Sequence, residues 1–215
     1  SFTSDQDAIL KYFNISERKV KDIISIGDDF LLIHTDASVT RVNAEKNTKD
    51  ELKDYNSYLK QESITPTSVN VSDKNELWII YTNGLIHKLD INSFSIISEY
   101  HHLKEIFGGE QHDFRMVIDN NGDLWIHLFQ NYGVFNYQIE KNKLNHYTKE
   151  SKELPLSSNL ISAIEKDGDG KIWIGSDLGG INVIDVNDLF VRYIKNNTEI
   201  GNTLSHNSIT SLYVD

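Results

Sequence analysis

The sequence predicts an all-β fold, and three observations agree on it. The tryptophans Trp78, Trp125 and Trp173 recur at separations of 47 and 48 residues. Each one follows a cluster of turn-forming Asp, Asn and Gly residues and lies in a short apolar run, such as Leu124-Trp125-Ile126. Aromatic residues make up 10% of the chain, which favours strands. A fixed period of this length is typical of repeat architectures, so we assign each strand from its position within the repeat.

The unit around Trp173 predicts four short strands joined by tight turns. The predicted strands are 161–165, 171–175, 180–184 and 190–194. Asp167-Gly168-Asp169-Gly170 supplies residues that tolerate the positive φ of a tight hairpin. Four antiparallel strands in about 45 residues are typical of a β-propeller blade. One such sheet cannot cover both of its own faces, so blades stack, and we expect the tryptophan to fill the space between neighbours.

The same phase predicts a single partial propeller over residues 1–215, with about four blades and the first strand of a fifth. We expect the outer strand of a preceding blade and a connecting loop at 1–19, blades at 20–62, 63–112, 113–155 and 156–203, and the first strand of the next blade at 204–215. Propellers close with roughly four to eight blades, so we expect a part of a larger propeller. In the first blade Leu31 stands in the tryptophan place. Its fourth strand is hard to locate within 47–59, and both 50–60 and 7–17 also fit short helices.

The composition of the chain limits the classes of partner that it can bind. The chain carries 21 Lys and Arg against 32 Asp and Glu, a net charge of −11, which disfavours nucleic acid as a partner. It has no cysteine, which excludes disulfides, Cys-zinc sites and thiol nucleophiles. No stretch approaches the roughly 18 apolar residues that span a bilayer, and there is no leader pattern. We therefore expect a soluble segment without membrane contact of its own.

Catalytic and metal chemistry find little support in the sequence. An EF-hand loop beginning at the turn before Trp173 would need Gly and Glu where Ile172 and Leu178 stand, so a hairpin turn is the better interpretation. His101-His102 would point to opposite faces of a strand and could not share an ion. His127 follows the tryptophan by two and is expected to pack between blades. We predict no catalytic residue, no metal and no cofactor.

A ligand site should follow propeller geometry. Strands alternate in direction, so the loop between the second and third strands shares a rim with the loop that enters the next blade. The rim residues that we expect to contact a ligand are Asp36, Asn83, Asn131, Tyr132, Asn159, Asp177 and His206. Carboxylate, amide, imidazole and aromatic groups together suit the hydroxyls and CH faces of a sugar. Several of these residue types are also common turn formers.

One stretch resembles a known family, the two-component regulator propeller repeat. The resemblance is carried by Leu156-Ser157-Ser158-Asn159, by Asp167 to Ser176 with its Trp-Ile-Gly run, and by Gly179-Gly180-Ile181-Asn182. Leu204-Ser205-His206-Asn207 repeats its opening. The second and third blades depart from the pattern, since Ile80 and His127 stand in place of the glycine of Trp-Ile-Gly.

The resemblance implies the periplasmic sensor region of a hybrid two-component histidine kinase of the kind found in gut Bacteroidetes. Such a segment would bind an oligosaccharide or relay its binding to the kinase, and it would not itself be an enzyme. A homodimer formed through the full ectodomain is a further partner that the resemblance implies. Two alternatives stay open. One is a purely structural or dimerising propeller segment without its own ligand, and the other is a polysaccharide-active enzyme that uses a rim carboxylate such as Asp36 or Asp177.

Overall fold

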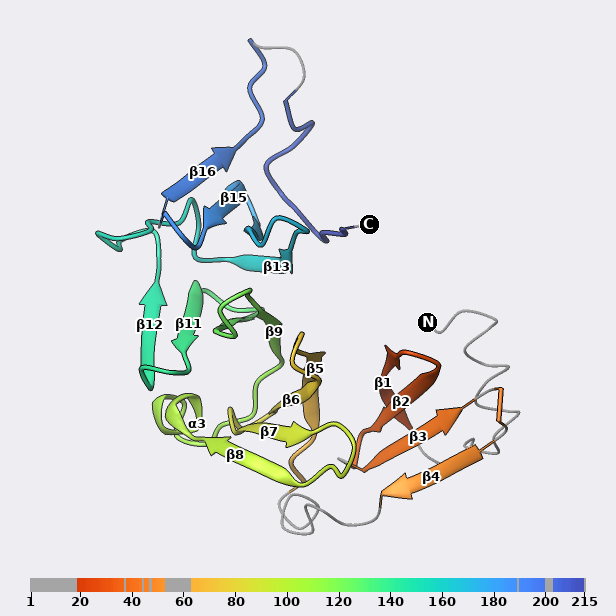
Figure 1. Ribbon diagram of the computed structural model, residues 1–215. Coiled ribbons are helices and arrows are strands. Elements are labelled where there is room, and N and C mark those ends of the chain that lie inside the picture. The colour runs from red at the N-terminus through yellow and green to blue at the C-terminus, as the bar shows by residue number, and fades with distance from the viewer. Residues whose placement is uncertain are drawn as a thin grey trace. The chain divides into compact units, whose positions relative to one another are not determined.

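Four separate four-stranded antiparallel sheets make up the chain, as the computed structural model shows (Figure 1), and the predicted all-β fold of propeller blades is confirmed. The structure describes residues 19–214 except 37, 44, 47, 53–62, 189 and 200–202. At 50–52 it describes the backbone but not the side chains. The chain divides into two compact units: unit 1 contains residues up to 69 and 75–111, and unit 2 contains 70–74 and residues from 112 onward. The two units are described separately below.

The first two sheets follow one another along the chain. The first sheet contains β1 (Val20–Ile26), β2 (Asp29–His34), β3 (Val39–Asn43) and β4 (Thr48–Leu52), and the second contains β5 (Pro66–Val71), β6 (Glu76–Tyr81), β7 (Ile86–Asp90) and β8 (Ile96–Tyr100). In both sheets sequence neighbours pair in order. The fourth strand of the first blade is thus present as β4 (Thr48–Leu52), and the helical alternative for 50–60 is wrong where it overlaps this strand, at 50–52. The rest of that alternative, and the segment 7–17, lie outside the described residues.

A short helix follows β8 that the sequence did not predict. This helix, α3, runs over His102–Ile106, with His101 as its N-cap residue. The expectation that His101-His102 lie on a strand is therefore wrong, and the argument that they face opposite sides of a strand does not apply. Leu103 is the buried residue of the helix. One buried residue in a helix of five does not produce a hydrophobic periodicity that can be detected in the sequence.

The third and fourth sheets lie in unit 2. The third contains β9 (Phe114–Ile118), β10 (Leu124–Leu128), β11 (Val134–Gln138) and β12 (Lys143–Tyr147), and the fourth contains β13 (Ile161–Lys166), β14 (Ile172–Ser176), β15 (Gly180–Asp185) and β16 (Phe190–Ile194). Their inner strands are almost continuously buried, whereas β12 and β16 are partly exposed edge strands. Each predicted strand of the fourth blade agrees with the observed one to within one residue at either end.

The last part of the chain does not form the strand that was expected at 204–215. Residues 203–214 have no regular secondary structure. The segment is nevertheless attached to the fourth sheet. Ile209 N donates to the carbonyl of Ser176 at 3.1 Å, and Gly180 N donates to the carbonyl of Asn207 at 2.7 Å. Residues 1–18, where an outer strand was expected, lie outside the described part of the chain.

Trp125 occupies the place between sheets that the repeat predicted. It is buried in a cluster with Val117 of β9 and with Ile161 and Ile164 of β13, so it joins the third and fourth blades. Its other face stacks on Tyr147 of β12, with ring centroids 5.9 Å apart. In unit 1 Trp78 stacks in the same way on Tyr100 of β8, at 5.6 Å. In these two blades an aromatic at the end of the fourth strand thus packs on the tryptophan, and the sequence pattern did not reveal it.

The turn before each tryptophan of unit 2 is closed by its first aspartate. Asp119 Oδ2 accepts the Trp125 indole N–H at 2.9 Å, and Asp167 Oδ2 accepts that of Trp173 at 2.7 Å. The Oδ1 atom of each aspartate accepts the backbone N–H groups two and four residues further on. Both carboxylate oxygens of Asp167 are therefore used by the turn, which supports the hairpin interpretation over a calcium loop.

Asp167 makes the stability of the fourth blade depend on pH. Burial acts to raise its pKa, but the hydrogen bonds from the Trp173 indole and from the backbone of Lys171 and Asp169 outweigh it, and the pKa lies below the ordinary 3.8. A lowered pKa gives stability that is complete above the unfolded-state pKa and is lost as the pH falls through the folded-state pKa. We expect the melting temperatures of the wild type and of Asp167→Asn to differ at pH 6 and to converge toward pH 3. A gap that stays constant over this range would contradict the assignment.

Candidate functional site

The predicted rim exists in unit 2 and is built around two equivalent asparagines. Asn159 accepts the N–H of Lys149 on its Oδ1 at 2.7 Å, and its backbone carbonyl accepts the N–H of Gly133 at 2.9 Å. Asn207 accepts the N–H groups of Asn196 and Gly180 in the same two ways. Each asparagine therefore ties the entering loop of its blade to the end of the previous fourth strand and to the turn between the previous second and third strands. The Leu-Ser-x-Asn opening of the repeat has this structural purpose.

Side chains at the start of β9 and beyond the end of β10 form an aromatic and cationic patch on this rim. Phe129 is 53% exposed although it is fully apolar. The Arg115 guanidinium lies 5.7 Å from the centroid of its ring, and Arg115 donates to both carboxylate oxygens of Asp113 at 3.0 and 3.1 Å. That pairing compensates the charge of Arg115 and fixes the plane of its guanidinium. We call Arg115, Phe129, Asn131 and Tyr132 the rim cluster.

Asn131 and Tyr132 extend the patch through the loop that leads to β11. Both are exposed, and Tyr132 retains 39% of its surface. The Tyr132 ring lies edge-to-face against the ring of His112, at 6.5 Å, and its backbone carbonyl is hydrogen-bonded by the imidazole of His146. The loop is therefore held at its base while its side chains face solvent. An amide, two rings and a guanidinium at one rim are groups that bind a polar ligand with apolar faces.

His127 lies beneath this cluster as a neutral, buried imidazole. Its ring is 5.3 Å from that of Phe129 and nearly perpendicular to it. Burial is the main cause that lowers the pKa of His127 to about 4, and the charge of Arg115 acts in the same direction. The prediction that His127 packs between blades agrees with its burial, but its Nδ1 has no hydrogen-bond partner among the described residues. A buried nitrogen of this kind needs water or a ligand to satisfy it.

The other predicted rim residues of unit 2 have different surroundings. Asp177 is exposed, and its Oδ1 accepts the Ser208 hydroxyl at 2.6 Å. His206 is exposed, and its Nδ1 accepts the backbone N–H of Ser208 at 3.1 Å. Both side chains hold the 205–208 loop onto the fourth blade and still face solvent. Both polar side-chain atoms of Asn159 have hydrogen-bond partners, because Oδ1 accepts the N–H of Lys149 and Nδ2 donates to Glu150. As a ligand contact it is the weakest of the three.

Unit 1 contains the remaining two predicted residues. Asn83 is buried, and its Oδ1 accepts the N–H of Leu85, so its side chain shapes the turn and is not presented to a ligand. Asp36 is exposed and accepts both the backbone N–H and the hydroxyl of Ser38. Turn formation explains both residues. Among the predicted rim residues, Asn131 and Tyr132 thus have the geometry best suited to contact with a ligand.

Sequence reasoning missed Phe129 and Arg115. Phe129 follows the predicted second strand directly, and a large apolar residue next to the polar Gln-Asn-Tyr-Gly loop was an available signal. Arg115 could not be assigned, because its place opposite His127 depends on the register of β9 with β10. Among the described residues, no group of three or more His, Cys, Asp or Glu side chains could hold a metal ion, and no helix is long and apolar enough to cross a membrane.

Comparison with known proteins gives the fold and one local family match. The family described as two component regulator propeller matches residues 155–177, which confirms the resemblance over that range. No curated protein matches the chain. Among solved structures, the extracellular domain described as that of the hybrid two component system BT4673 from B. thetaiotaomicron gives a TM-score of 0.58 at 14% identity, covering 91% of this chain and 24% of that one.

Two further solved structures show the same architecture. The corresponding domain of BT3049 from B. thetaiotaomicron gives a TM-score of 0.55 at 22% identity and covers 91% of this chain and 24% of that one. A streptogramin B lyase gives 0.50 at 17% identity, covering 77% of this chain and 51% of that one. The chain spans about a quarter of the length of the B. thetaiotaomicron domains. At these identities the likeness establishes the propeller fold.

Proposed function

We propose that the chain is a sensor segment of the periplasmic part of a hybrid two-component histidine kinase, and that its rim cluster binds an oligosaccharide. The observation that carries the proposal is the exposure of Phe129 and Tyr132 on a loop that is otherwise rigidly attached to its blade. Exposed rings on a fixed scaffold bind at a low cost in conformational entropy. The match at 155–177 and the fold shared with the B. thetaiotaomicron extracellular domains support the signalling role and the location outside the cytoplasm.

Binding without catalysis is the better-supported function of the rim. A glycosidase needs two opposed carboxyl groups, of which one usually has a raised pKa. Burial raises the pKa of Asp123 and of Glu165, but Asp123 lies in the turn between β9 and β10, and Glu165 lies near the end of β13. These strand ends are opposite to the ends that carry the rim loops, so neither group reaches the rim cluster.

Alanine substitution tests the rim cluster. We expect Phe129→Ala to weaken binding of the oligosaccharide that the wild type binds most tightly by at least tenfold, because the sugar loses its stacking surface; this is about 1.4 kcal/mol. The measurement is isothermal titration calorimetry of the full chain against fragments of plant and host glycans. Tyr213→Ala is the matched control, since it removes a ring that is also exposed but belongs to the irregular segment after the fourth sheet. Equal affinities of Phe129→Ala and wild type would favour the structural or dimerising alternative.

A further inference from the structure

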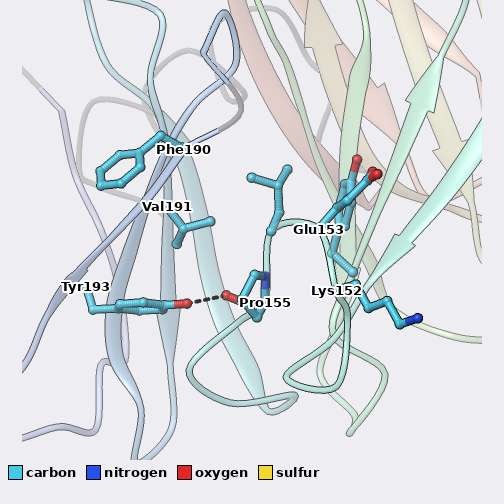
Figure 2. A pocket seen from close by; sticks show the side chains of 8 residues that line it. Lys152, Glu153, Pro155, Phe190, Val191 and Tyr193 are labelled. Carbon is cyan, nitrogen blue, oxygen red and sulfur yellow. Dashed lines mark hydrogen bonds between the residues drawn. The ribbon is translucent and has the colours of Figure 1, made fainter.

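Unit 2 has a second concave surface that involves none of the rim-cluster residues. A pocket of about 480 Å³ lies between β12, β16 and the loop that follows β12. Three aromatic residues line it, namely Tyr147, Phe190 and Tyr193, and Figure 2 shows Tyr193 directed toward Pro155 and the Phe190 ring directed away from it. The volume is within the range of small-ligand sites. We call this surface the edge-strand pocket.

The architecture of the blade does not require the two aromatics of β16. Phe190 is 64% exposed and Tyr193 is 43% exposed. In the third blade the strand register places Lys143 and His146 at the equivalent positions, which pair with Gln138 and Phe135. A polar residue therefore satisfies the fold at either position. Tyr193, which is directed toward the pocket, is therefore a large ring on an edge strand that the fold of the blade does not require.

The walls of the pocket are fixed before any ligand arrives. The Tyr193 hydroxyl donates to the carbonyl of Pro155 at 2.6 Å, a contact drawn in Figure 2, which links β16 to the loop and holds the ring in place. On the other wall Tyr147 stacks on the buried Trp125. Rings that are already ordered lose little conformational entropy on binding.

The polar groups of the pocket determine the class of ligand. Lys152 and Glu153 both line it and are exposed, and their opposite charges offset each other. Burial raises the pKa of Tyr147, and the nearby charge of Glu153 adds to the effect, so the carboxylate lies close to this ring. An acceptor and a donor beside aromatic faces suit a neutral ring with several hydroxyl groups, because CH faces stack on the rings while hydroxyls bond to the charged groups.

We propose that the edge-strand pocket is a second binding site of the chain, which takes a neutral oligosaccharide through Tyr147, Tyr193 and Glu153. The class of ligand rests on the proposed function as well as on the pocket, whereas the existence of the site rests on the pocket alone. Tyr147 and Tyr193 provide the stacking surface, and Glu153 accepts hydroxyl hydrogen bonds. The chain then holds one saccharide on its rim and another on the outer edge of its blades.

Methyl NMR of the full chain separates the two sites. Cellohexaose, xylohexaose and maltohexaose are the neutral probes, and a trimer of galacturonic acid is the charged one. The methyl groups of Val191 and Leu154 report on the edge-strand pocket, and those of Leu128 report on the rim. We expect at least one neutral probe to shift both sets. Tyr193→Ala should abolish the shifts of Val191 and Leu154 and leave those of Leu128 unchanged, and Glu153→Gln should weaken binding at the edge-strand pocket at least threefold.

Each other outcome is decisive for one of the two proposals. Shifts at Leu128 without shifts at Val191 and Leu154 would overturn the second site and leave the rim proposal intact. Shifts at the pocket alone would support the second site and contradict the rim. Tighter binding of the galacturonate trimer at the pocket would overturn the assignment to neutral sugars. The absence of chemical-shift changes in both sets of methyl groups with all four probes would overturn the site. Tyr213→Ala serves as the control for loss of an exposed ring, and it should change neither set.

Discussion

Gly133→Ala is expected to lower the free energy of unfolding of the chain by roughly 2–5 kcal/mol. Gly133 has a φ of +76°, a conformation that costs any L side chain energy. An added Cβ would lie 2.2 Å from the backbone carbonyl oxygen of Tyr147, which cannot move without distorting the end of β12. Chemical denaturation followed by tryptophan fluorescence measures the effect. The variant should also lose rim binding, because Gly133 ends the Tyr132 loop.

Gly122→Ala is the matched control for this prediction. Gly122 has almost the same φ, +82°, but nothing lies within 4 Å of an added Cβ. We therefore expect only the cost of the left-handed backbone, about 1–2 kcal/mol. The difference between the two variants isolates the steric contact at the rim. Equal losses in both would show that the turn at Gly133 adjusts freely and that the rim loop is not rigidly held.

Asp119→Ala should destabilise the third blade by roughly 2–4 kcal/mol. The substitution removes the acceptor of the Trp125 indole and leaves a buried N–H without a partner. It also removes the bonds to the backbone of Asn121 and Asp123 that close the turn. Thermal and chemical denaturation provide the measurement, and the near-ultraviolet circular dichroism of tryptophan should change together with stability.

Asp169→Ala provides the comparison for Asp119→Ala. Asp169 lies in the equivalent turn of the fourth blade, but its carboxylate reaches only the exposed Lys171 ammonium, at 3.2 Å. Exposed pairs of this kind contribute little to stability, so we expect a change within about 0.5 kcal/mol. A loss at Asp119 no larger than that at Asp169 would mean that the hydrogen bond to the indole does not hold the blade together.

The repeat predicted the blades because the same packing problem recurs in each of them. Trp125 and Trp173 appear in the sequence at the positions where they pack and bond to Asp119 and Asp167, so their spacing reports the strands around them. Trp78 shows the limit of that reasoning. The residue six positions before it is Ser72 instead of aspartate, and its indole N–H is buried with no hydrogen-bond partner among the described residues.

The candidate site was less predictable, because turn residues and ligand-binding residues have the same chemistry. Asn83 and Asn159 were predicted as rim contacts, yet their amides bond to the backbone or to Glu150. Phe129 and Arg115 come together only through the pairing of β9 with β10, and the edge-strand pocket forms only where the loop after β12 meets β16. Register and exposure are properties of the folded chain that a single sequence does not display.

Saccharide binding by the rim cluster is the central claim, and a calorimetric titration of the wild-type chain tests it most directly. The panel consists of oligosaccharides from plant and host polysaccharides, each titrated to millimolar concentration. We predict saturable binding of at least one of them, together with protection of the Phe129–Tyr132 loop in hydrogen exchange. The absence of binding by every member of the panel, with the chain folded by circular dichroism, would contradict the account.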